Sequence, residues 1–141
     1  MKTIYTTSAV ASGNGRDGRI ASLDGLLAAD VRMPPELGGQ GGATNPEQLF
    51  AAGYAACFHS ALKLVAGAAH ADTSDSEVVA DVSLGALDSG AFGLAVSLEV
   101  SLPALEQADA RALVERAHEV CPYSQRGPRQ RRGQPERGLT S

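Results

Sequence analysis

The first third of the chain alternates between short apolar stretches and glycine-rich breaks, which is typical of strands joined by turns. Residues 3–12 (TIYTTSAVAS) are rich in Thr, Val, Ile and Tyr and end at Gly-Asn-Gly, which predicts a strand followed by a turn. Residues 19–23 are predicted to return as the hairpin partner, which leaves Arg16 at or beside the turn. Residues 26–33 are predicted to form a third short strand before a loop rich in Gly and Pro.

Two longer segments have helical periodicity. Thr44-Asn45-Pro46-Glu47 predicts a helix start, because it supplies a capping side chain, a proline near the first helical position and an acid at the positive end of the helix dipole. Residues 48–70 are apolar nearly all round, so we expect this helix to be buried on most sides, inside the domain or at a subunit interface. Residues 105–120 are predicted to form a second helix that ends at Cys121-Pro122.

Between these two helices the pattern changes to an alternation of apolar and polar positions. Residues 78–87 and 92–102 alternate apolar and polar positions around Asp88-Ser89-Gly90, which predicts a hairpin with one buried face. The order of strands, helix, strands and helix indicates the α+β class. A closing strand is expected after the second helix, to cover the open sheet edge. Residues 125–141 (QRGPRQRRGQPERGLTS) show no alternation, so the final strand is predicted to be missing.

Composition limits the remaining possibilities. The chain has 141 residues, enough for one domain, and its 43% hydrophobic content with only 4% aromatic indicates a core of Ala, Val and Leu. No run of apolar residues approaches the length of a membrane span, and the N-terminus lacks the apolar segment of a secretory signal peptide. We therefore expect a cytoplasmic protein without a membrane span. The net charge of -4 gives no reason to expect nucleic-acid binding, although residues 125–134 are locally basic.

Cys57 and Cys121 are the two cysteines of the chain. In a reducing compartment such a pair is buried, metal-binding or catalytic more often than it is a permanent disulfide. There is no CxxC pair, and two cysteines 64 residues apart with three scattered His residues make a poor zinc site, so no metal is expected. From the residues alone, an inert cysteine in the middle of an apolar helix remains an alternative to a reactive Cys57.

Three motifs place these residues in a known family. NPEQLFAAGYAACF (residues 45–58), GRDG (15–18) and VCPYS (120–124) closely resemble the organic hydroperoxide resistance proteins (Ohr) of the OsmC/Ohr family. The resemblance covers about residues 3–124, most of the chain. It implies a single domain over residues 1–124, with antiparallel sheets around two helices, one long and central, and an intertwined homodimer.

The resemblance also implies an activity, that of a cysteine-based organic hydroperoxide reductase. Cys57 would be the peroxidatic nucleophile and Cys121 the resolving cysteine, while Arg16 would stabilise the Cys57 thiolate and Glu47 would hold Arg16 by an ion pair. The thiolate attacks the distal peroxide oxygen, and the resulting sulfenic acid condenses with the second thiol to a disulfide. No bound cofactor is implied; dihydrolipoyl groups of lipoylated proteins would be the reductant.

An apolar wall on the long helix would accommodate an alkyl or fatty-acid hydroperoxide better than hydrogen peroxide. The residues predicted to bind the substrate in this way are Phe50, Tyr54, Phe58 and Leu62. His59 faces nearly the opposite side of the helix and is expected to pack, and His118 is expected on the exposed or half-exposed face of the second helix.

Helix geometry adds a constraint on the catalytic set. Glu47 and Cys57 are ten residues apart, which on a straight helix separates them by about 15 Å along the axis and roughly 80° around it. One guanidinium cannot easily contact both from a single helix. We therefore predict that the Glu47 that reaches a given Arg16 and Cys57 comes from the partner chain.

Other functions are compatible with the same residues. The two thiols could form a non-enzymatic redox switch, the chain could be an OsmC-type osmotically inducible peroxidase, or it could be an Ohr relative impaired at its C-terminus. A switch would consume about one equivalent of peroxide and stop, whereas an enzyme would turn over with a lipoyl reductant.

The C-terminus departs from the resemblance after Ser124. Ohr-like chains continue in a segment resembling SNATRGNIDV, which supplies the final strand, whereas residues 125–133 are QRGPRQRRG here. One choice of codons for these residues, read one frame over, gives NGARGNVEV. We infer a one-nucleotide insertion near Ser124, in the gene or in its recorded sequence, and expect residues 125–141 to be a disordered basic tail. Resequencing of this junction tests the inference.

Overall fold

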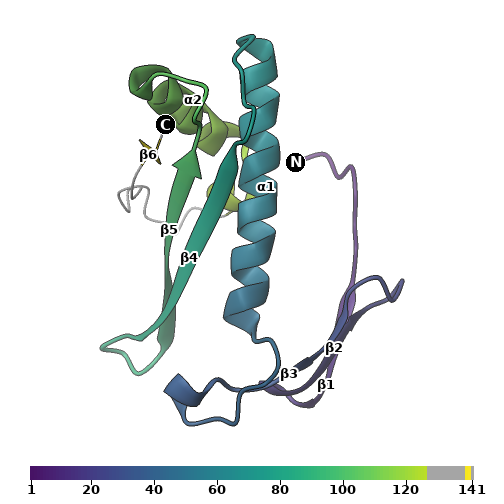
Figure 1. Ribbon diagram of the computed structural model, residues 1–141. Coiled ribbons are helices and arrows are strands. Elements are labelled where there is room, and N and C mark those ends of the chain that lie inside the picture. Colours follow the sequence, from purple (N-terminus) through teal and green to yellow (C-terminus); the bar gives the residue numbers. More distant parts are fainter. Residues whose placement is uncertain (127–138, 141) are drawn as a thin grey trace. The chain divides into compact units, whose positions relative to one another are not determined.

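The computed structural model describes residues 1–126 and 139–140, which form two compact units, Met1–Leu49 and Phe50–Ser141. Each unit contains one sheet, and the first unit ends within the long helix (Figure 1). The elements in chain order are β1 (Ala9–Asn14), β2 (Asp17–Ser22), β3 (Ala28–Val31), the 3-10 helix η1 (Pro35–Leu37), α1 (Pro46–Ala68), β4 (Glu77–Ala86), β5 (Phe92–Ser101), α2 (Gln107–Val120), α3 (Pro122–Gln125) and β6 (Leu139–Thr140). This order confirms the α+β class with antiparallel sheets and a long helix.

The first unit is an antiparallel meander with strand order β1-β2-β3. Asn14 pairs with Asp17, so the hairpin turns over Gly15 and Arg16 and leaves Arg16 at its tip. Gly15 has a φ of 62°, a left-handed value that glycine adopts without a steric penalty. The prediction for the first strand was wrong at its start, since the observed strand begins at Ala9 rather than at Thr3. The ladder with β2 ends at the pair Ala9–Ser22, so it does not extend to the earlier residues.

The start of α1 agrees with the sequence prediction. The Asn45 side-chain carbonyl accepts a hydrogen bond from the Gln48 backbone N–H at 2.9 Å, and Pro46 is the first helical residue. This cap satisfies one of the N–H groups that a helix start leaves without a partner. Glu47 therefore lies in the first turn, at the positive end of the helix dipole.

The second unit contains the β4–β5 hairpin, paired from Glu77–Ser101 to Ala86–Phe92. β6 adds two residues that run parallel to β5 opposite Val100 and Ser101, whereas most of the segment where the closing strand was predicted to be missing lies outside the described residues. Because β6 has two residues, it covers only this end of β5. Residues 127–138 and 141, most of the predicted basic tail, lie outside the described residues.

The core of the second unit lies where α1 packs against β5 and α2, and Figure 1 shows the hairpin running beside the long helix. Every buried member is apolar, and aliphatic residues predominate, as the composition predicted. The buried members are Tyr54, Phe58, Ala61, Leu62, Val65 and Ala66 from α1, Leu98, Val100 and Leu102 from β5 and the residue after it, and Ala110, Leu113, Val114, Ala117 and Cys121 from α2 and its end.

The rest of α1 is not buried inside the single chain, so of the two predicted alternatives only the subunit interface could cover it. Within one chain Leu64 is 69% exposed, and Ala52, Ala56 and Ser60 are exposed as well. Among the described residues, α1 is the one helix whose length and composition would suffice to cross a membrane, a criterion that the core helix of a soluble protein also meets. No unbroken apolar run in the sequence indicates such a helix, because mean hydropathy tolerates scattered polar residues such as Lys63.

Candidate functional site

The two cysteines, 64 residues apart in sequence, lie side by side in the second unit. Cys57 is half-buried in the middle of α1, and Cys121 is fully buried at the C-terminal cap of α2. The Cys121 thiol donates to the Cys57 sulfur across 3.8 Å. A disulfide of about 2.05 Å therefore requires the two sulfurs to approach by a little under about 2 Å.

The surroundings of Cys57 within its unit favour the neutral thiol. Burial is the largest influence and raises the pKa of Cys57, and the neighbouring Cys121 raises it further. A backbone hydrogen bond from Tyr123 acts in the opposite direction and lowers the pKa. A thiolate at this position therefore benefits from an additional cation.

Arg16 and Glu47 form the shorter and less exposed of the two ion pairs in the first unit. The two terminal guanidinium nitrogens donate to the two carboxylate oxygens of Glu47, each at 2.7 Å, in the bidentate geometry that gives such pairs their strength. The hydrogen bonds from Arg16 lower the pKa of Glu47, and the carboxylate raises the pKa of Arg16. Both side chains are more than half buried, with 34% of Arg16 and 16% of Glu47 exposed.

This pair corrects one sequence prediction. The Glu47 that holds Arg16 belongs to the same chain and does not come from a partner. The prediction placed Arg16 together with Cys57 on one chain and Glu47 on the other, and the ion pair within one chain overturns the placement of Glu47 relative to Arg16. Arg16 lies in the β1–β2 turn, 31 residues before Glu47, and no local pattern indicates that its side chain reaches the first turn of α1.

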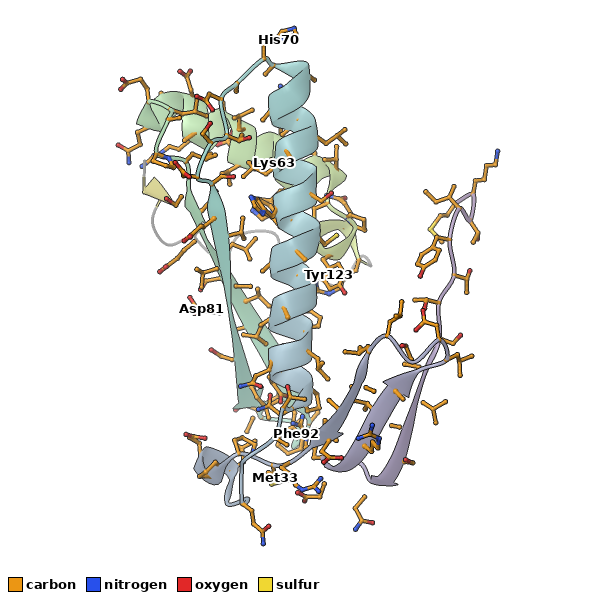
Figure 2. The ribbon with its side chains drawn as sticks, turned by 45° about the vertical axis from the view of Figure 1, so that its right-hand side comes forward. Met33, Lys63, His70, Asp81, Phe92 and Tyr123 are labelled. Atoms are coloured by element: carbon orange, nitrogen blue, oxygen red, sulfur yellow. The ribbon has the colours of Figure 1, made fainter. Side chains whose placement is uncertain are left out.

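A short turn after Cys121 packs onto α1. This turn is α3, which the sequence did not predict, and it directs the Tyr123 ring onto the helix where Gly53 leaves room (Figure 2). Tyr123 joins Phe50 and Tyr54 in an aromatic cluster whose ring centroids are 5.5–6.1 Å apart, within the range of favourable aromatic contacts.

A hydrogen-bonded group that sequence reasoning missed ties the same turn to both helices. The Ser124 hydroxyl lies 2.9 Å from the Tyr54 hydroxyl and 2.9 Å from His118 Nδ1. The His118 ring also packs against Phe58, with centroids 4.7 Å apart. These contacts join α1, α2 and α3. In the sequence, the signals that could have suggested these contacts are the Ser124 hydroxyl in VCPYS and the position of His118 three residues before Cys121.

The residues predicted to bind an alkyl chain divide into two groups. Phe58 and Leu62 have no exposed surface and belong to the core. Tyr54 is almost buried, and Phe50 is partly exposed and packs against the core from outside. In the described part of the chain, no cluster of three or more His, Cys, Asp or Glu residues could hold a metal ion.

Gly53 allows a matched test of the contact between Tyr123 and α1. A methyl group at Gly53 would come within 2.6 Å of the Tyr123 hydroxyl oxygen, whereas one at Gly67 on the same helix meets no atom within 4 Å. We expect Gly53→Ala to lower the free energy of unfolding by about 1 kcal/mol because the packed ring must move. Gly67→Ala should raise it by about 0.5–1 kcal/mol through helix propensity. Urea unfolding of both variants measures the change in the free energy of unfolding. A Gly53→Ala variant more stable than the unmodified protein would contradict the packing of the Tyr123 ring over Gly53.

The fold and the site together define a small α+β protein with a paired thiol centre on its long helix. Residues 39–126 match the family model of OsmC-like proteins, and the chain belongs to this family. It is 50% identical over 125 residues to the organic hydroperoxide resistance protein of Xanthomonas axonopodis pv. citri, covering 87% of each chain. It is 47% identical over 122 residues to the organic hydroperoxide resistance protein OhrA of Bacillus subtilis, covering 84% of this chain and 85% of that protein.

The fold also matches solved structures. The crystal structure of an organic hydroperoxide resistance protein OsmC from Legionella pneumophila superposes with a TM-score of 0.83 at 54% sequence identity. The match covers 87% of this chain and 89% of the Legionella chain. Organic hydroperoxide resistance is therefore the functional class that the relatives and the fold support.

Proposed function

We propose that this protein is a cysteine-based peroxidase that reduces organic hydroperoxides to alcohols. The observation that carries the proposal is the 3.8 Å separation of the Cys57 and Cys121 sulfurs, one half-exposed and the other buried. A nucleophilic thiol that a peroxide can reach, beside a second thiol that it cannot, suits a two-cysteine cycle.

The reaction balances in three steps. The Cys57 thiolate attacks the distal oxygen of ROOH; the O–O bond breaks, RO⁻ takes a proton and leaves as ROH, and Cys57 becomes a sulfenic acid. The Cys121 thiol then attacks the Cys57 sulfur, so that a disulfide forms and the sulfenic oxygen leaves as water. A dithiol of the dihydrolipoyl type reduces the disulfide and is itself oxidised to a cyclic disulfide.

Arg16 is proposed to stabilise the Cys57 thiolate from a second copy of the chain. Its guanidinium is bound through both terminal nitrogens to Glu47, in the first turn of α1, and Cys57 follows Glu47 by ten residues along that helix. A homodimer would bring the Arg16–Glu47 pair of one copy to the Cys57 of the other. Exposed apolar side chains such as Leu64 support an association of this kind.

The proposed alkyl-binding wall is smaller than the sequence suggested. Phe50 and Tyr54, with the Tyr123 ring beside them, would supply the part of this wall that the Arg126 guanidinium over the Phe50 ring leaves open. Phe58 and Leu62 would support this surface from the core, because neither has an exposed atom for a substrate to contact. We expect the protein to be cytoplasmic, where lipoylated enzymes can serve as electron donors.

A turnover assay tests the proposal. The protein is mixed with excess cumene hydroperoxide and dihydrolipoamide, and the hydroperoxide consumed per protein is counted. An enzyme is expected to consume many equivalents. Consumption that stops at about one equivalent, with dihydrolipoamide present, would identify a redox switch that uses the same thiol pair.

A further inference from the structure

The first arginine of the basic C-terminal segment is bound to the aromatic cluster. The Arg126 guanidinium carbon lies 4.4 Å from the centroid of the Phe50 ring and 5.3 Å from that of Tyr54, within the range of a cation–π contact. One of its terminal nitrogens donates to the Tyr123 backbone carbonyl at 2.6 Å. Arg126 therefore connects the turn that follows Cys121 to α1.

The turn that Arg126 holds carries three groups that matter to the thiol pair. Cys121 stands at its beginning, as the cap of both α2 and α3. Tyr123 supplies the backbone hydrogen bond to Cys57 and places its ring over Gly53. Gln125, the last residue of α3, donates from its side-chain amide to the His118 carbonyl at 2.7 Å and so fixes the turn to α2 as well.

We propose that Arg126 is a positioning residue for disulfide formation, because it fastens the turn after Cys121 to the Phe50 and Tyr54 rings of α1 and so keeps the Cys57 and Cys121 sulfurs within reach. Arg126 touches neither sulfur in the described contacts and acts through Tyr123 and the turn. The proposal rests on the proposed function in one respect, because disulfide formation between Cys57 and Cys121 is one step of the proposed peroxidase cycle.

The chemistry of arginine suits this position. Its guanidinium stays charged at every physiological pH, its planar face stacks on aromatic rings, and its edge can donate at the same time to a carbonyl oxygen. A lysine retains the charge and one donor but loses the planar stacking, so it should replace Arg126 in part. A methionine retains the apolar stem and loses both the charge and the donors.

The test measures disulfide formation without a hydroperoxide. The reduced protein is treated with a diazene oxidant such as diamide, which takes two hydrogens as the two thiols join, and the loss of free thiols is followed in time. Arg126→Met is expected to slow the reaction about tenfold, and Arg126→Lys to restore it to within about threefold of the unmodified protein. Arg116→Met, at an exposed position on α2, is the matched control and should have no effect.

A second variant probes the same contact from α1. Phe50→Leu removes the ring face and keeps an apolar side chain, so it should slow the reaction by a similar factor. Its effect should not add to that of Arg126→Met, because both remove one interaction. This variant also serves as the test if Arg126→Met does not fold, which circular dichroism shows.

Two results would overturn the proposal. One is disulfide formation in Arg126→Met, or in Phe50→Leu, at the rate of the unmodified protein. The other is a slowing of equal size in Arg116→Met, which would indicate a general effect of lost positive charge. Because diamide replaces the hydroperoxide, these results are independent of whether the protein turns over hydroperoxides.

Discussion

Replacing Cys57 with serine is expected to abolish hydroperoxide reduction, lowering kcat/KM for cumene hydroperoxide with dihydrolipoamide by at least about 10³-fold. Serine keeps the size of the side chain, but its hydroxyl is too weak a nucleophile to open the O–O bond. Cys57 is half-buried, so the substitution should leave the fold intact. The assay compares initial rates, with circular dichroism confirming that both proteins are folded.

Cys121→Ser is the matched control, because it removes the second thiol and keeps the first. It should still react with one equivalent of hydroperoxide at a rate close to that of the unmodified protein. The product should be Cys57 sulfenic acid, seen by mass spectrometry as one added oxygen, and no disulfide should form. Equal peroxidase rates for Cys57→Ser and the unmodified protein, or equal inactivity of both, would refute the proposed enzyme.

Phe58→Ala is expected to have the largest effect on stability. The ring has no exposed surface and lies at the centre of the core between α1, β5 and α2, with the His118 ring packed against it. Removing it leaves a cavity that costs about 3–5 kcal/mol, out of a total free energy of unfolding that is typically about 5–15 kcal/mol. Urea unfolding monitored by circular dichroism measures the loss.

Phe92 supplies the control for that experiment. It begins β5 and is 74% exposed, so Phe92→Ala should change the free energy of unfolding by no more than about 0.5 kcal/mol. All proteins must be compared at one concentration, because association of two copies would add to the measured stability. A similar loss of unfolding free energy for both substitutions would mean that Phe92 is covered in solution. It would also mean that Phe58 does not contribute more to stability than Phe92 does.

The start of α1 and the β4–β5 hairpin could be predicted because their signals are local. The Asn45 cap and Pro46 act on the next few residues, and the observed helix begins where they place it. The β4–β5 turn joins two strands that are neighbours in sequence, so alternation within each strand was enough. The start of β1 was missed because residues 3–8 have strand-forming composition but β2 ends before it can pair with most of them.

The candidate site was only partly accessible from sequence. The motifs identified Cys57, Cys121, Arg16 and Glu47 as a set, and two pairs of them do come together, Cys57 with Cys121 and Arg16 with Glu47. The residues around the pairs could not be foreseen. The three-way contact at Ser124 and the packing of Arg126 depend on how α3 folds back, which no local pattern encodes.

The sequence by itself determined the class of fold and the family, and it predicted the candidate site residues, because capping, alternation and motif identity are properties of neighbouring positions. Only the tertiary structure decided that the Glu47 of the same chain holds Arg16, that Phe58 and Leu62 belong to the core, and that Cys121 is the more deeply buried thiol. These outcomes depend on which surfaces distant segments cover when they pack. Burial and side-chain distance are properties of that packing, and a linear pattern carries them only indirectly.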